Sequence, residues 1–338
     1  MNSTQTIKAA QITPGGGIES LAWGQRRVSD PGEHEVRIRV RAVSLNYRDL
    51  VIASGHYPLS HAHPLVPVSD GAGTVEAVGA AVTRVRPGDR VSANFVRDWV
   101  SGPFGPAQQA SSLGGEVDGM LSEDVVLPEH ALVPIPESMS FAEAAALPCA
   151  GVTAWNALIF HGRVQAGHTV VVQGTGGVSL FALQIAKHSG ARVFATTSDD
   201  AKSAKLRALG ADLVINYRTT PNWGSVVREH TKGQGADHIV EVGGAGTFEE
   251  SLRAVRLGGE ISVIGFLAGT AANLNLVPVI LNHVRLNGIF VGSREMFEEL
   301  LLTPIRPVID QTFGFGEVSQ AYRYLQSGKH TGKVILEN

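Results

Sequence analysis

The stretch that decides the fold reads VVVQGTGGVSLFALQIAKHSG and runs from Val170 to Gly190. It opens with a short apolar run, which is typical of a strand buried in a parallel sheet. Gly174, Gly176 and Gly177 then fill a tight turn that leads into a helical pattern. Glycine lets the backbone approach a pyrophosphate, and the N-terminus of the following helix directs N–H groups toward it. The stretch therefore predicts a strand-turn-helix unit that binds a dinucleotide.

The glycine fingerprint G-x-G-x-x-G is one residue short, because Ser179 holds the place of the third glycine. Serine is small enough to keep the helix close to the strand. The alternative is an ordinary glycine turn, and the position of the motif between an apolar strand and a helix favours the dinucleotide site. The predicted contacts of this loop are Gly174, Thr175, Gly176, Gly177 and Val178.

Outward from this stretch, strands and helices alternate regularly, which predicts a doubly wound parallel sheet. We expect strands at 191–197, 212–216, 236–242 and 260–266, and helices at 179–189, 200–209, 223–230 and 247–255. Ser140 and Glu143 predict a capping box that begins a helix upstream. The last stretch, GFGEVSQAYRYLQSGKHTGKVILEN, predicts a helix and a strand that return to the first domain.

The first third of the chain alternates with a period of two. Val36, Ile38, Val40 and Ala42 fall on one face of the segment 34–45, with arginines between them. This pattern is typical of a half-buried antiparallel strand. Frequent glycines and prolines in the following segments indicate a β-barrel or a β-sandwich. The glycine-rich segment 98–119 predicts a long functional or mobile loop.

Composition limits the classes of function. The chain has 338 residues and a net charge of −3, with no basic run that would indicate a nucleic-acid partner. No uninterrupted apolar stretch is long enough to span a bilayer. Cys149 is the only cysteine, so an internal disulfide is excluded and a reducing compartment is expected. We therefore expect a cytoplasmic protein that acts on a small molecule.

The end of the second strand bears on the choice of dinucleotide. NAD sites usually place an acidic residue there, whereas this strand is expected to end at the neutral Thr197. Ser198 and Lys202 are then candidates to bind a 2′-phosphate, and Tyr217 to lie beside the adenosine. We therefore expect NADP(H). If Asp199 sits at the strand end and not at the next helix N-terminus, the preference reverses to NAD(H).

By its motifs the chain resembles the medium-chain dehydrogenase/reductase superfamily, and within it the zinc-free quinone oxidoreductase branch. The similarity covers nearly the whole chain. The resemblance implies a GroES-like β-barrel catalytic domain at 1–126 and 298–338, and a Rossmann dinucleotide-binding domain at 127–297. It is carried by SLNYRDL (44–50), PLVPVSDGAGTVEAVG (64–79), LPCAGVTAW (147–155), QGTGGVS (173–179), LGADLVINY (209–217) and VGSR (291–294).

The resemblance also bears on metal. Zinc-dependent members have a cysteine at the position of Asn46 and a His-Glu pair at the positions of Ser69 and Asp70. Their third ligand is a cysteine at the position of Cys149. Catalytic zinc needs three protein ligands, and this chain retains one of them. We therefore expect no metal, and we expect Cys149 to be a small buried or pocket-lining residue.

Without zinc there is no strong Lewis acid, so quinones and activated alkenes are the expected hydride acceptors. The expected function is NADPH-dependent, zinc-independent reduction of a quinone or an α,β-unsaturated carbonyl compound. The catalytic candidates are Asn46, Tyr57 and the weaker Tyr47. The alternatives are a zinc-dependent alcohol dehydrogenase and a non-catalytic NADPH-binding protein. Further cofactor contacts implied by the resemblance are Thr153, Gly243, Gly265, Phe266, Val291, Ser293 and Arg294.

Members of this branch commonly dimerise through an edge strand of the Rossmann sheet. The apolar segment RLNGIFVGS (285–293) is a candidate for that edge. An exposed apolar edge strand tends to pair with another chain. We therefore expect a homodimer.

Overall fold

A computed structural model describes residues 4–60, 63–271 and 275–338. The chain divides into two compact units. A β unit comprises Met1–Val152 with Val291–Asn338, and a parallel-sheet unit comprises Thr153–Phe290. The C-terminal stretch belongs to the β unit, as its helix and strand pattern predicts. The boundaries between the units fall at 152/153 and 290/291, whereas the expected domain boundaries lie at 126/127 and 297/298.

The segment 127–152 stays with the β unit because it pairs and packs there. Strand β7 (Leu132–Pro134) pairs antiparallel with β5 (Arg90–Ala93). Helix α3 (Phe141–Ala145) packs on two strands of the same sheet. It begins as predicted, because the Ser140 hydroxyl accepts a bond from the Glu143 N–H at 3.1 Å. Residues 127–152 therefore belong to the β unit, and the division of the chain falls between Val152 and Thr153.

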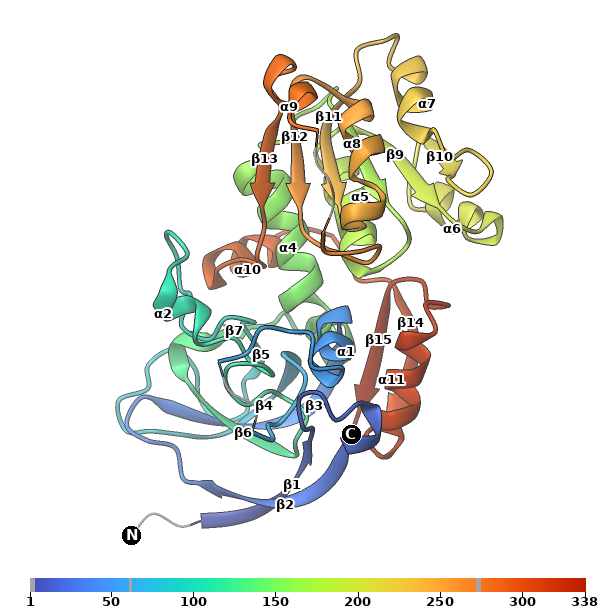
Figure 1. Cartoon of the computed structure of the whole chain (residues 1–338). Coiled ribbons are helices and arrows are strands. Elements are labelled where there is room, and N and C mark those ends of the chain that lie inside the picture. The colour runs from blue at the N-terminus through green and yellow to red at the C-terminus, as the bar shows by residue number, and fades with distance from the viewer. Residues whose placement is uncertain (1–3, 61–62, 272–274) are drawn as a thin grey trace. The chain divides into compact units, whose positions relative to one another are not determined.

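The β unit is organised around β3 (Glu35–Leu45), which pairs with three other strands. The predicted alternation is confirmed, because Val36, Ile38, Val40 and Ala42 are buried while the arginines between them are not. The seven-stranded sheet has the order β14-β15-β3-β4-β5-β7, with β6 also on β3, and β1 and β2 form a separate pair (Figure 1). The remaining elements of this unit are β1 (Thr4–Gln11), β2 (Ala22–Ser29), α1 (Tyr47–Ala53), β4 (Asp70–Val78), α2 (Pro106–Gln109), β6 (Asp124–Pro128), α10 (Arg294–Leu301), β14 (Ile309–Gly314), α11 (Val318–Gln326) and β15 (Lys333–Glu337).

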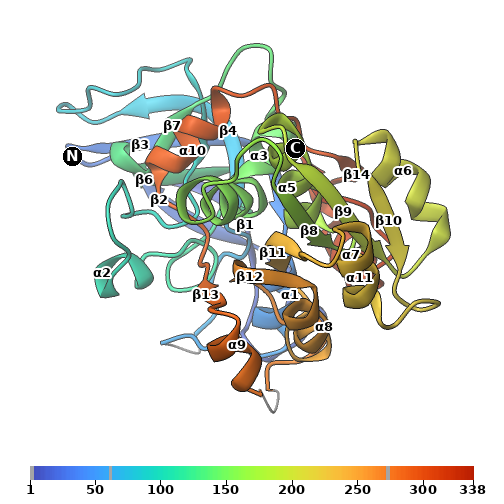
Figure 2. The same cartoon turned by 90° about the horizontal axis from the view of Figure 1, so that it is seen from above.

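The second unit is built on a parallel sheet of six strands in the order β10-β9-β8-β11-β12-β13. Counted from its own first strand, this is the order 3-2-1-4-5-6 of a Rossmann sheet. Helices cover both faces of the sheet (Figures 1 and 2). The elements are α4 (Val152–Trp155), β8 (Thr169–Gln173), α5 (Gly177–His188), β9 (Arg192–Thr197), α6 (Ser203–Ala208), β10 (Leu213–Asn216), α7 (Trp223–His230), β11 (Ala236–Glu241), α8 (Phe248–Ala254), β12 (Val255–Val263), α9 (Val277–Leu281) and β13 (Arg285–Gly288).

The predicted elements of this unit are present, and two of them differ from the expected bounds by three residues or more at an end. The segment 200–209 starts as a 3-10 turn, Asp200–Lys202, before α6. Strand β12 starts at Val255 and ends at Val263, because Val255 already pairs with Ala236 of β11. The doubly wound α/β architecture is confirmed. Among the described residues, no helix is both long and apolar enough to cross a membrane.

The segment 98–119 packs against its own unit. It contains α2, and isolated bridges join Val96 to Ser112 and Leu113 to Val117. Leu113 is fully buried, and its carbonyl accepts a bond from the Arg48 guanidinium at 2.7 Å. This part of the loop is therefore held in place by internal contacts.

A pair of histidines, of which His238 is buried, lies at the start of two neighbouring strands of the parallel sheet. His168 precedes β8, and His238 lies on β11 with only 5% of its surface exposed. The two rings meet at 3.0 Å between His168 Nδ1 and His238 Nε2, and the Gln165 N–H also donates to His168 Nδ1. Burial lowers the pKa of His238 to about 4, and His168 adds to the effect.

This pair predicts a loss of stability in acid. The folded state holds His238 neutral, whereas the unfolded chain takes up a proton near pH 6.5. The free energy of unfolding should therefore be unaffected above pH 6.5 and fall by about 1.4 kcal/mol per pH unit from 6.5 toward 4. Urea unfolding at pH 7 and pH 5, compared between wild type and His238→Gln, measures how much of the loss of unfolding free energy is due to His238. The variant should lose less stability than wild type over this range, and equal losses would refute the assignment.

Candidate functional site

The glycine loop between β8 and α5 has the form that its sequence predicts. Gly174 adopts a φ of +75°, which disfavours any residue with a side chain. Gly176 caps the helix with extended dihedrals, and a Cβ built on it meets no atom within 4 Å. The loop thus leaves open space in front of a helix N-terminus, and the helix dipole makes that space favourable for an anion.

Ser179 performs the role expected of the third position in the fingerprint. It is 1% exposed, and its hydroxyl donates to the Gln173 carbonyl oxygen at 2.6 Å. This bond ties the first turn of α5 to the end of β8. The serine therefore holds the helix against the strand by a hydrogen bond, where a glycine would do so by its size.

Thr197 is the last residue of β9, as predicted, and it is buried. Asp199 lies beyond the strand and caps the 3-10 turn, where its carboxylate accepts a bond from the Ala201 N–H at 2.9 Å. Ser198, between them, is half-buried. The acidic side chain is thus assigned to the start of the next helical segment, and the strand end itself is neutral.

The other residues predicted near the adenosine lie on the neighbouring segments. Lys202 ends the 3-10 turn. Tyr217 follows β10, its N–H donates to the Thr197 carbonyl oxygen at 2.9 Å, and its side chain is 40% exposed. The Asp200 carboxylate accepts a bond from the Asn216 side-chain amide at 2.9 Å. Lys202 and Tyr217 are therefore both placed on segments that border the end of β9.

Two further loops carry predicted cofactor contacts, and they lie against each other. The Ala268 N–H donates to the Gly243 carbonyl at 2.7 Å, so the loop after β12 pairs with the loop after β11. A Cβ on Gly265 would lie 2.6 Å from the Val242 carbonyl oxygen. This glycine is required by the close approach of the two loops to one another. Phe266, the next residue, is 38% exposed.

Two buried polar residues that no motif in the sequence singles out as site residues lie at the ends of strands. Gln173 is the last residue of β8 and Glu241 is the last residue of β11, and both are buried. They bond to each other, with Gln173 Nε2 donating to Glu241 Oε2 at 2.7 Å. A polar residue that interrupts two buried strands immediately before a glycine loop is the signal that identifies them.

In the β unit, the strand register brings distant residues to one end of the sheet. Val334 pairs with Leu45, and Ser44 pairs with Asp70. Lys333, at the start of β15, and Asn46, just beyond β3, therefore lie beside the first residue of β4. All of these side chains are buried, and that of Lys333 is only 3% exposed.

The polar atoms of this sheet end form one network. The Lys333 ammonium donates to the Asn46 Oδ1 at 2.5 Å and to the Leu45 carbonyl at 2.8 Å, and it lies 3.9 Å from Asp70 Oδ2. Burial raises the pKa of Asp70, while Lys333 and then the Asn46 amide oppose that effect. Because an ammonium group only donates, its partner on Asn46 must be the carbonyl oxygen. The amide orientation of Asn46 is thereby fixed.

Cys149 and Ser69 join the same network through Asp70. The Cys149 backbone N–H donates to Asp70 Oδ2 at 3.1 Å, and the Ser69 hydroxyl donates to Asp70 Oδ1 at 2.7 Å. Cys149 lies in a π-helical turn, Leu147–Gly151, a distortion that is frequent at functional sites. Burial and then the Asp70 carboxylate raise the pKa of its thiol. The thiolate form is thus disfavoured, and thiolate is the form that ligates metal or attacks a substrate.

The backbone beside this network is strained. Val68, which precedes Ser69, is fully buried and has a φ of +71°, a region that β-branched residues avoid. The Met120 N–H donates to its carbonyl at 2.7 Å, and a Cβ on Gly114 would lie 2.7 Å from its carbonyl carbon. Strained backbone held by tight surroundings concentrates at functional sites.

The predicted tyrosines flank helix α1. Tyr57 is half-buried, and the Arg48 guanidinium lies 4.9 Å from its ring centroid and 4.6 Å from that of Phe95. Tyr47 is 45% exposed.

The backbone N–H of Asn46 donates to the Asp49 carboxylate at 2.7 Å, and burial raises the pKa of that carboxyl to about 7. Asp49 therefore serves the fold of the loop.

The remaining predicted contacts fall on segments near the division between the units. Thr153 lies on α4 and is 3% exposed. Val291 is buried with a φ of +48°, and Ser293 caps α10 by accepting a bond from the Met296 N–H at 3.3 Å. Arg294 donates to the His130 carbonyl at 3.0 Å. The Arg294 side chain is thus anchored within the β unit.

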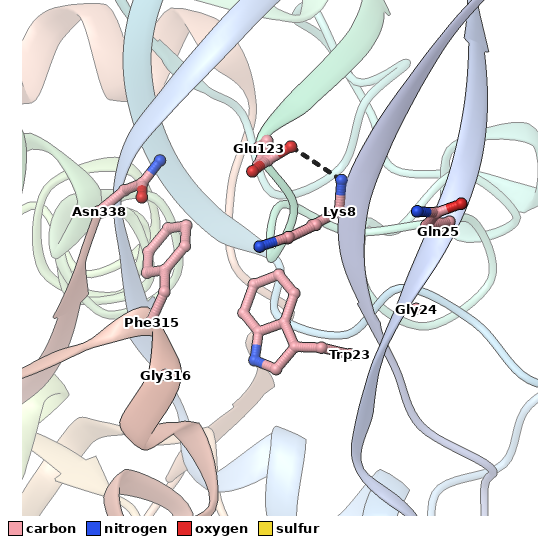
Figure 3. A pocket seen from close by; sticks show the side chains of 8 residues that line it. All are labelled: Lys8, Trp23, Gly24, Gln25, Glu123, Phe315, Gly316 and Asn338. Carbon is pink, nitrogen blue, oxygen red and sulfur yellow. Dashed lines mark hydrogen bonds between the residues drawn. The ribbon is translucent and has the colours of Figure 1, made fainter.

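A separate cavity of about 540 Å³ opens in the β unit between the β1–β2 pair and the segment after β14. Figure 3 shows its wall, in which the Trp23 and Phe315 rings stack at 5.9 Å and the Lys8 N–H donates to Glu123 at 2.8 Å. None of the predicted site residues lines it. The cavity therefore belongs to the scaffold of this unit and not to the candidate site.

Comparisons with known proteins match both units. The model of the alcohol dehydrogenase GroES-like domain matches residues 32–137, and that of the zinc-binding dehydrogenase matches residues 177–303. A zinc-type alcohol dehydrogenase-like protein of Schizosaccharomyces pombe is 45% identical over 91% of each chain. An acryloyl-coenzyme A reductase of Metallosphaera sedula is 33% identical over 92% of this chain and 95% of its own. A quinone oxidoreductase of Pseudomonas aeruginosa is 31% identical over 97% of this chain and 99% of its own.

The fold agrees with solved structures. The crystal structure of a putative alcohol dehydrogenase from Sinorhizobium meliloti superposes with a TM-score of 0.89 at 44% identity, and it covers 98% of this chain and 99% of its own. The match extends over both units, so the GroES-like and Rossmann-like assignments are confirmed.

The open space at Gly176 predicts how a small substitution acts. Gly176→Ala adds a Cβ where no atom lies within 4 Å, at extended dihedrals that alanine adopts freely. The fold should tolerate it, while a pyrophosphate at the loop would meet the added methyl. We expect about tenfold weaker NADPH binding in a fluorescence titration, with little change in melting temperature. Gly316→Ala, which also points into open space, is the control. Unchanged binding in Gly176→Ala would place the dinucleotide elsewhere.

Proposed function

The chain belongs to the medium-chain dehydrogenase/reductase superfamily, and from that premise we propose that it is an NADPH-dependent, zinc-independent oxidoreductase that reduces quinones or α,β-unsaturated carbonyl compounds. Its membership of an oxidoreductase family rests on the relatives. The choice of cofactor, the independence of zinc and the class of substrate are the proposal.

The observation that carries the proposal is the network around Lys333. Asn46, Ser69 and Cys149 hold the positions of the three zinc ligands in zinc-dependent members, and they do not fit the metal. The Asn46 carbonyl oxygen already accepts the Lys333 ammonium, and the Ser69 hydroxyl already serves Asp70. Burial disfavours the Cys149 thiolate. A catalytic zinc site needs three ligands of the His, Cys or carboxylate kind. Among the described residues, no group of three such side chains could hold a metal ion.

The parallel-sheet unit fits a nicotinamide dinucleotide. The space before Gly176 and the N-terminus of α5 suit its pyrophosphate, and the loops that carry Gly243, Gly265 and Phe266 border the same end of the sheet. When bound, the cofactor would supply hydride.

The end of β9 supports NADPH over NADH. The strand ends at neutral Thr197, and the Asp199 carboxylate is engaged by the Ala201 N–H, so neither presents a free acid to a ribose hydroxyl. Ser198 and Lys202 lie just beyond the end of β9, where they offer a hydroxyl and a positive charge for a 2′-phosphate.

Asn46 is proposed as the donor to the substrate oxygen. Its carbonyl end is held by Lys333, so the amide NH₂ is the end that can donate outward. That group contacts the Ser44 carbonyl oxygen at 3.5 Å and also donates to the Asp70 carboxylate, so a substrate oxygen would compete with these two acceptors. Negative charge developing on a quinone or enone oxygen would be stabilised there. The Tyr57 hydroxyl, or that of the exposed Tyr47, would then deliver the proton.

Two relatives support this substrate class. One is named a quinone oxidoreductase and another an acryloyl-coenzyme A reductase, and acryloyl groups are alkenes conjugated to a carbonyl. Such acceptors delocalise the incoming charge themselves, so a metal Lewis acid is not needed. The zinc-type alcohol dehydrogenase-like relative favours the alternative of alcohol oxidation.

The test is a cofactor oxidation assay. NADPH consumption is followed with benzoquinone and with cyclohexenone, with and without a chelator, and NADH is run in parallel. The proposal expects turnover that prefers NADPH and resists the chelator. Loss of activity on chelation, restored by zinc, would instead establish the alcohol dehydrogenase reading. Tight NADPH binding without turnover on any acceptor would establish a non-catalytic binding protein.

Replacement of Asn46 tests its role in the reaction. Asn46→Ala removes the proposed donor to the substrate oxygen and should lower kcat/KM about a hundredfold. Asn94→Ala is the matched control, because Asn94 is also fully buried in the β unit and its amide donates to the Val96 carbonyl at 2.8 Å. Both variants should lose some stability, and the control should keep its activity. Equal kcat/KM values in the two variants would exclude Asn46 as the donor.

We also propose a homodimer formed at the edge of the parallel sheet. Strand β13 is an edge strand of this sheet. The preceding helix α9 and its N-cap residue expose more than half of the surface of each of four apolar residues, namely Leu276, Val277, Ile280 and Leu281. A contiguous apolar surface beside an unpaired edge favours association. Light scattering should give about twice the 35.7 kDa of one chain, and Leu281→Glu should reduce it to one. A monomeric wild type would refute the proposal.

The cytoplasmic location stays a prediction.

A further inference from the structure

Gln173 and Glu241 occupy equivalent places on adjacent strands. Each is the last residue of a strand whose other members are largely apolar, and each is followed by a loop with predicted cofactor glycines. Glu241 is fully buried and Gln173 is 5% exposed. The ion pairs found among the described residues do not include Glu241. Its carboxylate must therefore be compensated by hydrogen bonds.

Five donors supply that compensation. Oε1 accepts the N–H groups of Gly243 at 2.8 Å and Gly244 at 2.9 Å, and the Thr247 hydroxyl at 2.5 Å. Oε2 accepts the Gln173 amide at 2.7 Å and the Ser251 hydroxyl at 2.5 Å. Three of the five donors come from the loop that follows β11. The carboxylate thus acts as the centre around which this loop is folded.

Gln173 extends the same network to the glycine loop. Its Oε1 accepts the N–H groups of Val242 and Gly243, both at 3.2 Å, and its carbonyl accepts the Ser179 hydroxyl of α5. The base of the Gly174 loop and the loop after β11 are therefore joined by one pair of side chains. The backbone of Glu241 also accepts the Ile264 N–H at 2.9 Å, which brings in the loop after β12.

We propose that Glu241 is a positioning residue for the dinucleotide, because its carboxylate holds the loop after β11 against Gln173 at the base of the Gly174 loop. The inference rests on the proposed function, since it assumes that these loops bind NADPH. The loop 242–247 contains three glycines, so hydrogen bonds and not apolar packing fix its shape. A shift of about 1 Å in such a loop is enough to lower binding strongly.

The test compares two carboxylates of the same sheet. Glu241→Gln keeps the size of the side chain but places an NH₂ among groups that donate, so at least one of the five hydrogen bonds to this side chain is lost. Glu260→Gln is the control, because Glu260 is 2% exposed on β12, pairs with Arg285 and lies in register with His238, away from the loops. Both variants are expected to melt at lower temperature than wild type.

The two variants should separate in kinetics. Glu241→Gln should raise the KM for NADPH about tenfold while kcat at saturating NADPH changes less than about threefold. Glu260→Gln should leave both constants near wild type. Equal KM values in the two variants would overturn the inference. A wild type that binds neither NADPH nor NADH would overturn the proposed function itself, and this outcome is distinguished by the wild-type titration alone.

An exchange of the two side chains provides a rescue. In Gln173→Glu with Glu241→Gln, the amide can donate to the new carboxylate, and the donors of the loop still find oxygen acceptors. The KM for NADPH should return to within about threefold of wild type. Gln173→Glu alone places two carboxylates together, so its KM for NADPH should be higher than that of Glu241→Gln and that of the exchanged protein. If Glu241→Gln fails to fold, the exchanged protein decides. A KM about tenfold above wild type at a normal melting temperature would then contradict the inference.

Discussion

A carboxylate buried at the end of a strand must be surrounded by donors, and this constraint shapes both units of the molecule. In the β unit the carboxylate is that of Asp70, and its surroundings are the Lys333 ammonium, the Ser69 hydroxyl and the Cys149 N–H. In the parallel-sheet unit it is that of Glu241, which is compensated by neutral donors alone. Each arrangement lies where a strand gives way to a loop with predicted functional residues. The hydrogen bonds and the ion pair that compensate these two buried carboxylates thus hold the residues of the candidate site in place.

The two networks differ in what they allow. Around Asp70, the Asn46 carbonyl oxygen is already bonded to Lys333 and the Ser69 hydroxyl to Asp70, and the fixed orientation of Asn46 leaves its NH₂ as a donor. Around Glu241, the bonds hold the loop after β11 and reach Gln173, which ends β8 just before the open positions Gly174 and Gly176. The proposed chemistry needs hydride from a bound dinucleotide and a neutral hydrogen-bond donor to the substrate oxygen, the role proposed for Asn46. Acceptors that stabilise their own charge suit such a site.

Local patterns in the sequence predicted much of this structure. The apolar strand and glycine turn at 170–178, the strand-helix alternation and the capping box at Ser140 each depend on neighbours a few residues away, and each is present. The Lys333 network could not be predicted in this way, since its two bonded side chains are 287 residues apart in the chain. The bond between Gln173 and Glu241 spans 68 residues and depends on strand order. The division between the units also escaped prediction, because it follows from the pairing of β7 with β5 and not from composition.

We propose that hydride transfer in this chain needs no metal, and elemental analysis of a preparation that is turning over substrate is the decisive experiment. Metal content and NADPH-dependent turnover of quinone should be measured on the same purified preparation, across fractions that differ in residual metal. The account predicts a turnover number that does not vary with metal content and persists when zinc is far below one ion per chain. A turnover number that rises in proportion to bound zinc would contradict it.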